Sequence, residues 1–112
     1  LSALNKITPN QLSLLMYKVR STPSYQAFYN GLIVGGHPDQ FHAGALSKRF
    51  TDWNTRYHIK GKTGYISGTH SLTGLAQGFY SRNVYMFSIM SDRYGGSIQS
   101  IDNVMKHIII HH

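Results

Sequence analysis

A lysine, a threonine and a glycine stand together near the middle of the chain, at Lys62, Thr63 and Gly64. They follow a strand-like run over residues 56–61 and precede a turn over residues 65–69 that is rich in glycine and serine. At the end of a strand, an ammonium group and a hydroxyl group can bind a carboxylate together, and a glycine lets a substrate backbone lie close. The tripeptide therefore predicts a carboxylate-binding site. Taken alone, Lys62 is more often a solvated lysine at a strand end, and Gly64 is more often a turn glycine.

Helices are predicted near both ends of the chain. Thr8 and Pro9 indicate a helix start, as N-cap and first helical residue, and residues 20–23 end that helix. Residues 24–30 predict a short second helix, and a last helix begins near Ser97, after the Gly95-Gly96 pair. Apolar residues recur with helical spacing in the first helix (Leu12, Leu15, Met16, Val19) and in the last (Ile98, Ile101, Met105, Ile108).

Three strands are predicted between these helices, over residues 56–63, 71–79 and 84–91. The short connections at 64–69 and 80–83 favour antiparallel hairpins. The last strand is apolar on both sides, which indicates a sheet covered by helices above and below. Residues 44–50 are ambiguous between a helical turn and a loop.

The predicted class is α/β (α+β), with an antiparallel three-stranded sheet between N- and C-terminal helices. Such a sheet is thin for an independent domain, and one of its edges should be covered by something else. Residues 1–112 therefore look like part of a larger fold.

Composition narrows the function classes. The 112 residues carry 11 Lys and Arg against 4 Asp and no Glu, for a net charge of +7, but the cations are scattered and form no nucleic-acid motif. The absence of cysteine excludes disulfides and thiol catalysis, and no apolar run reaches the roughly 20 residues of a membrane helix. Four histidines lack metal-ligand spacing, so we expect neither a metal nor another cofactor; they are His37, His42, His58 and His70.

Five further segments, taken in order with the Lys-Thr-Gly strand at 59–64, carry a resemblance to a known family. They are residues 1–12, Leu32–Gly36, Gly44–Phe50, 71–75 and 86–90. They resemble the stretch after the Ser-x-Asn motif, the Leu-Pro-x-x-Gly and Gly-Thr-Leu-x-x-Arg-Phe segments, and two later strands of D-alanyl-D-alanine carboxypeptidase/endopeptidases. These enzymes are the low-molecular-mass class C penicillin-binding proteins. The resemblance implies the C-terminal part of a transpeptidase domain like that of penicillin-binding proteins and serine β-lactamases.

The chain departs from the family pattern in several places. Ala45 stands where threonine is usual, Tyr65 follows the tripeptide where threonine or serine is usual, and residues 37–43 are longer and richer in histidine. No serine is followed by a lysine three positions later, as the nucleophile's Ser-x-x-Lys motif requires. Residues 81–83 match Ser-x-Asn in letters, but they follow the Lys-Thr-Gly strand in a predicted hairpin turn, so we interpret them as a coincidence.

The resemblance therefore implies that the nucleophile, its lysine base and the true Ser-x-Asn lie N-terminal to Leu1, on a missing segment or a separate chain. This chain alone is then expected to be inactive. The implied chemistry is acyl transfer through a serine ester, on D-Ala-D-Ala or cross-linked peptides of peptidoglycan, with acylation by β-lactams. The implied location is the periplasm or the cell exterior.

Each residue of the tripeptide region takes an implied role in this chemistry. Lys62 and Thr63 would bind the substrate's terminal carboxylate, and Gly64 would leave room for a substrate strand. The backbone N–H of Tyr65 would form half of the oxyanion hole, and Ser67 would be a further donor.

Two alternatives stay open. A serine β-lactamase shares the strand and the tripeptide, although the Thr8-Pro9 helix start and residues 44–50 favour the peptidase. A non-catalytic basic module that binds an anionic polymer is the alternative from another class.

Overall fold

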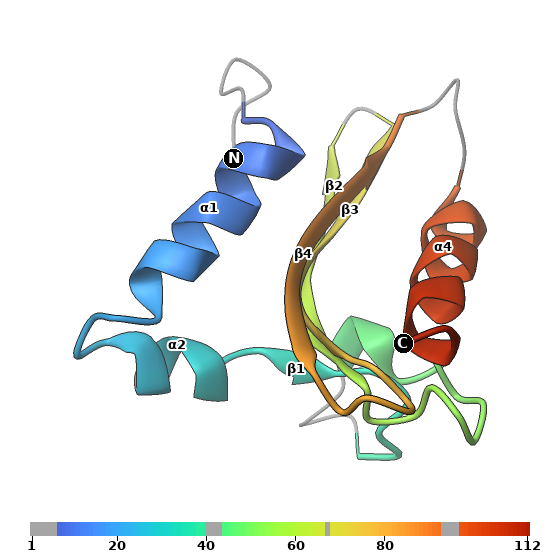
Figure 1. The fold of residues 1–112 in the computed structure, drawn as a ribbon. Helices are drawn as coiled ribbons and strands as arrows, with labels where there is room; N and C mark the ends of the chain where they lie inside the picture. Colours follow the sequence, from blue (N-terminus) through green and yellow to red (C-terminus); the bar gives the residue numbers. More distant parts are fainter. Residues whose placement is uncertain (1–6, 40–43, 67, 93–96) are drawn as a thin grey trace.

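The computed structural model describes residues 7–39, 44–66, 68–92 and 97–112. A four-stranded antiparallel sheet has the order β1-β2-β3-β4. Figure 1 shows α1 on one face of this sheet and α4 on the other, as the sequence predicted. The elements are α1 (Pro9–Val19), α2 (Tyr25–Asn30), β1 (Ile33–Val34), the 3₁₀ turn η1 (Gly44–Leu46), β2 (Ile59–Ile66), β3 (Thr69–Gln77), β4 (Val84–Ser91) and α4 (Ile98–Ile110).

The sheet has one strand more than the three that were predicted. The fourth strand, β1, contains only Ile33 and Val34, which pair with Gly61 and Lys60 of β2. Two residues are too few to show the alternation by which a strand is recognised in a sequence. Their pairing partners lie more than 25 residues away, so β1 depends on tertiary contacts.

The predicted position of the tripeptide at a strand end is wrong. β2 starts at Ile59, because Tyr57 has a left-handed φ of 68° that interrupts extended backbone. The strand then continues past Gly64, and Tyr65 and Ile66 pair with His70 and Thr69 of β3. The Lys-Thr-Gly tripeptide thus lies inside a strand.

Side-chain caps determine where both long helices begin. The Thr8 hydroxyl accepts a hydrogen bond from the Gln11 N–H at 3.1 Å, and the Gln11 side chain accepts one from the Thr8 N–H at 2.8 Å. Ser97 and Ser100 form the same reciprocal pair at the start of α4. Both predicted helix starts are confirmed, whereas the preceding Gly95-Gly96 lies outside the described residues.

The two faces of the sheet are packed very differently. The face toward α4 holds the core, whose members are 0–2% exposed: Leu46, Phe50, Ile59, Leu72, Ala76, Ile101, Met105 and Ile109. On the other face, Met16 is the one buried residue of α1, and its neighbours Leu14 and Leu15 are 50% and 54% exposed. β2 and β3 are therefore held mainly by the core on the α4 side, and the α1 side of the sheet is packed less tightly.

Candidate active site

The edge of β2 is open beside the tripeptide. β1 pairs with β2 only at Gly61 and Lys60, so among the described strands none pairs with residues 62–66 on that side. In an antiparallel strand the backbone groups of alternate residues point to opposite neighbours. The Ile59 carbonyl accepts the Gly35 N–H at 2.9 Å on the β1 side. Thr63 and Tyr65 lie four and six residues after Ile59, so their N–H and C=O groups point to the same side of β2, which at these residues is the open edge.

The ammonium group of Lys62 lies at this same edge. Its Nζ donates a hydrogen bond to the Thr63 carbonyl at 2.8 Å, and the residue is exposed. Lys60 is on the same face of β2 but is engaged elsewhere, with its Nζ 3.7 Å from the centroid of the Tyr29 ring. Burial lowers the pKa of Lys60, because desolvation disfavours its charged form. Lys62 is thus the cation that the strand holds beside Thr63 and Tyr65.

Two cavities border the tripeptide, one on each face of the sheet. The cavity on the α4 side has a volume of about 570 Å³ and is lined by Ala45, Arg49, Lys62, Thr63, Gly64, Tyr65, His70, Ser71, Ile98 and Ile101. The cavity on the α1 side, of about 430 Å³, shares Lys62, Thr63 and Ser71 but is otherwise mostly apolar, with six lining residues from the α1–α2 region: Leu12, Leu15, Met16, Val19, Phe28 and Leu32. The first lining contains two cationic side chains and no carboxylate.

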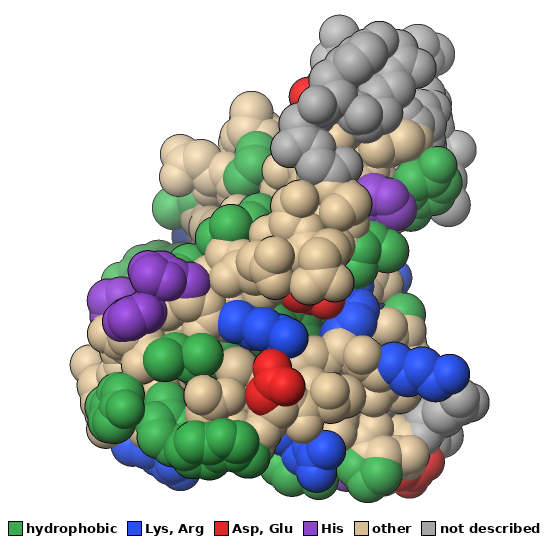
Figure 2. Space-filling view, turned by 90° about the vertical axis from the view of Figure 1, so that its right-hand side faces the viewer, with side chains coloured by type: hydrophobic (Ala, Val, Ile, Leu, Met, Phe, Trp, Pro, Cys, Tyr) green, Lys and Arg blue, Asp and Glu red, His purple; other side chains and the backbone are tan. Residues whose placement is uncertain are grey.

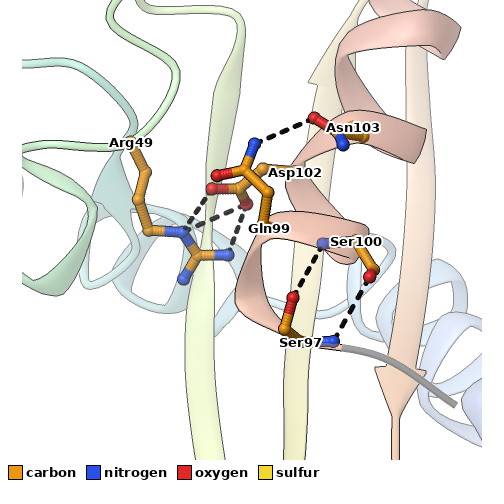
Figure 3. Close-up of polar contacts among 6 residues, drawn as sticks. All are labelled: Arg49, Ser97, Gln99, Ser100, Asp102 and Asn103. Atoms are coloured by element: carbon orange, nitrogen blue, oxygen red, sulfur yellow. Dashed lines mark hydrogen bonds and ion pairs between the residues drawn. The ribbon is translucent and has the colours of Figure 1, made fainter.

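Arg49 is fixed in the wall of the first cavity by α4. Its Nε donates to both carboxylate oxygens of Asp102, at 3.1 and 3.0 Å, and its Nη2 donates to Oδ1 at 2.6 Å (Figure 3). Both side chains are largely buried, 15% and 9% exposed. This ion pair ties the segment before β2 to α4.

Tyr65 and Gly64 border the same edge in different ways. The Tyr65 ring is 64% exposed and lies 4.6 Å, centroid to centroid, from the ring of His70, its partner across the strands. At Gly64, an added Cβ would come within 2.6 Å of the Ser71 hydroxyl oxygen. The absence of a side chain at Gly64 therefore leaves room for the Ser71 hydroxyl beside the edge of β2.

The structure brings four of the five predicted site residues together, namely Lys62, Thr63, Gly64 and Tyr65. Ser67 lies outside the described residues, as does His42. Arg49 and His70 also line the cavity, yet sequence reasoning gave them no role there. The Gly44–Phe50 resemblance was the only signal for Arg49, and the cross-strand register that brings His70 to Tyr65 was predictable only from correct strand bounds.

Residues 81–83 lie far along the sheet from this edge. They form the turn between β3 and β4, where the Ser81 hydroxyl accepts a hydrogen bond from the Asn83 N–H at 3.2 Å. The predicted hairpin turn is confirmed. Within the described ranges, no three His, Cys, Asp or Glu side chains are grouped closely enough to hold a metal ion.

The model of the D-Ala-D-Ala carboxypeptidase 3 (S13) family matches residues 1–109. The chain belongs to this family. The match spans the tripeptide together with both flanking helices, and it confirms the resemblance to D-alanyl-D-alanine carboxypeptidases. S13 membership means a serine peptidase with a D-Ala-D-Ala carboxypeptidase role. No curated protein matches the chain.

In this S13 chain the open edge, the Lys62 ammonium and the two cavities all adjoin the tripeptide in β2. No helix among the described residues of the S13 chain has the length and apolar character that crossing a membrane requires.

Proposed function

We propose that the chain supplies the carboxylate-binding strand and half of the oxyanion hole of a serine D-Ala-D-Ala carboxypeptidase/endopeptidase. Its substrates are D-Ala-D-Ala or cross-linked stem peptides of peptidoglycan, and β-lactams acylate the enzyme. The observation that carries the proposal is the unpaired edge of β2, to which Thr63 and Tyr65 direct their backbone groups with the Lys62 ammonium beside them. The family match supports the peptide substrate.

Binding begins with the substrate's terminal carboxylate. The Lys62 ammonium gives up its hydrogen bond to the neutral Thr63 carbonyl and donates to the charged substrate carboxylate instead, because charge-assisted hydrogen bonds are stronger. The Thr63 hydroxyl donates a second hydrogen bond to the same group. The substrate backbone lies along the open edge of β2, as an added strand would.

The Tyr65 N–H then acts on the scissile carbonyl. When a serine attacks this carbonyl, the carbon becomes tetrahedral and its oxygen becomes negatively charged. An N–H held by a paired strand stabilises this charge with little reorganisation. The terminal D-Ala leaves, and water hydrolyses the serine ester.

The serine itself comes from outside these 112 residues, since none of their serines has a lysine three positions later. The proposal places the nucleophile, its lysine base and the Ser-x-Asn motif N-terminal to Leu1 in the same protein, or on a separate chain. The half-exposed Leu14 and Leu15 of α1 and the apolar cavity beneath that helix support a covering segment on this side. The chain alone is inactive, and the working enzyme acts in the periplasm or outside the cell.

The test is reconstitution with fluorescent penicillin. We expect covalent label on a segment carrying Ser-x-x-Lys and Ser-x-Asn only when this chain is added, and no label on the chain alone. Slow loss of the label supports the peptidase, whereas rapid turnover would indicate the serine β-lactamase alternative. Tight binding of a polyanion that weakens steeply with salt, without any labelling, would instead indicate the basic module.

A further inference from the structure

Three aromatic side chains form a surface platform away from the tripeptide. The Phe79 ring lies between two others, with its centroid 5.3 Å from that of Trp53 and 5.1 Å from that of Tyr80, and both contacts are edge-to-face at 86° and 88°. Trp53 is 79% exposed and Tyr80 is 75% exposed, whereas Phe79 is packed against the core. We call Trp53, Phe79 and Tyr80 the aromatic platform. Figure 2 shows hydrophobic side chains gathered low on the α4 face, below a group of histidines.

Hydrogen bonds hold the platform's two loops in place. The Asp52 carbonyl accepts hydrogen bonds from the N–H groups of Thr55 and Arg56, at 3.0 and 2.8 Å, which close the turn that carries Trp53. Thr55 is fully buried, so this turn is anchored in the fold. The Phe79 N–H donates to the Ile109 carbonyl at the end of α4, at 2.9 Å. Two large rings are thus displayed on ordered backbone.

Such exposure needs an explanation, because these rings have apolar surface that could be buried. Trp and Tyr dominate binding energy at recognition surfaces, where a flat apolar face is combined with a polar edge. Charged groups lie close by: the Lys106 ammonium forms an ion pair with the Asp52 carboxylate at 3.0 Å, and Asp52 directly precedes Trp53. A pyranose sugar has the matching surface, with C–H groups on its faces and hydroxyl groups around its rim.

We propose that the aromatic platform binds the glycan strand of peptidoglycan, through N-acetylated amino sugars that stack on Trp53 and Tyr80. This inference rests on the proposed function, which makes the stem peptides of the same polymer the substrate. The platform and the open edge are separated by a distance that such a peptide spans. Thr73 pairs with Lys62 and lies six residues before Phe79, two of them beyond the end of β3 at Gln77, so the two sites are at most roughly 20 Å apart. An extended peptide of about six residues covers the same length.

Trp53 is the single tryptophan of the chain, so its fluorescence reports on the platform directly. The probe is a β-1,4-linked tetramer of N-acetylglucosamine, titrated into the chain with maltotetraose as the sugar control. We expect a saturable change in Trp53 emission with the tetramer and a much smaller one with maltotetraose. The variant Tyr80→Ala should weaken tetramer binding at least about tenfold, as loss of a central aromatic contact does. Tyr17→Ala is the matched control, since Tyr17 is an exposed tyrosine of α1, at 54%, and should bind normally.

Variants of Trp53 itself are followed by ligand-observed NMR, as saturation transfer from the protein to the tetramer. Trp53→Ala should abolish this transfer, and Trp53→Phe should retain part of it. No emission change and no transfer at millimolar tetramer would overturn the proposal. So would an emission shift that depends on protein concentration alone, because it would make the platform a protein interface. Penicillin labelling of the reconstituted enzyme should be unchanged by Trp53→Ala, and tetramer binding should be unchanged by Lys62→Ala. The two proposals can therefore fail independently.

Discussion

Arg49 and Asp102 lie 53 residues apart in the sequence and meet in a part-buried ion pair with three hydrogen bonds. The pair joins the segment that precedes β2 to the first turns of α4, at the wall of the cavity beside the tripeptide. Asp102 and Thr55 are the two buried polar or charged residues among those described. The contact therefore sets how α4 sits over the strand that carries Lys62.

Asp102→Ala should destabilise the fold strongly. It leaves the Arg49 guanidinium poorly solvated and without its partner, which costs about 3–5 kcal/mol in comparable pairs. Urea unfolding measures the loss. Asp52→Ala is the matched control: it breaks the more exposed Lys106–Asp52 pair and should cost less than about 1 kcal/mol. A double variant with Arg49→Met and Asp102→Leu should recover most of the stability. Equal losses of stability in Asp102→Ala and Asp52→Ala would contradict this account.

Lys62→Ala should slow acylation of the reconstituted enzyme by penicillin about 10- to 100-fold, the range that corresponds to losing one charged hydrogen bond. Lys60→Ala is the control, because Lys60 lies two residues earlier on the same face and packs on Tyr29 instead. It should leave the acylation rate nearly unchanged. Stopped-flow measurements with a fluorescent penicillin give both rates. If the two variants lose activity equally, Lys62 has no special role at the edge.

The helices and the hairpins were predictable from local signals, whereas the bounds of β2 were not. Thr8 and Ser97 carry their capping information within three residues. The start of β2 depends instead on the left-handed backbone at Tyr57, which no glycine marks. β1 is a strand because it pairs with Gly61 and Lys60 of β2. The Arg49 side chain is positioned by its ion pair with Asp102 of α4. Each of these features depends on contacts between distant segments, which a local pattern does not contain.

Gly64→Ala should affect stability and catalysis for separable reasons. The new Cβ would contact the Ser71 hydroxyl at 2.6 Å, and overpacking of this kind costs about 1–3 kcal/mol. Adding Ser71→Ala removes the contact and should restore the urea midpoint. The acylation rate should stay low in the double variant, because the substrate strand still meets the methyl group.

Gly74→Ala gives the comparison for Gly64, since its Cβ would overlap the Lys60 carbonyl on the neighbouring strand. Backbone cannot move aside as a hydroxyl can, so Gly74→Ala should be the more destabilised variant and Ser71→Ala should not rescue it.

Full recovery of acylation in the double variant Gly64→Ala with Ser71→Ala would show that the substrate does not approach Gly64.

Tyr65 tests whether the backbone N–H or the side chain serves catalysis. Tyr65→Pro removes the N–H, and it sacrifices no β2–β3 hydrogen bond because alternation directs this N–H to the open edge. We expect acylation to fall about 10²–10³-fold, the usual cost of one oxyanion donor. Tyr65→Thr keeps the N–H, removes the ring that stacks on His70, and should retain most of the acylation rate. Equal losses in the two variants, with unfolding curves that match the parent chain, would assign the role to the tyrosine ring and remove Tyr65 from the oxyanion hole.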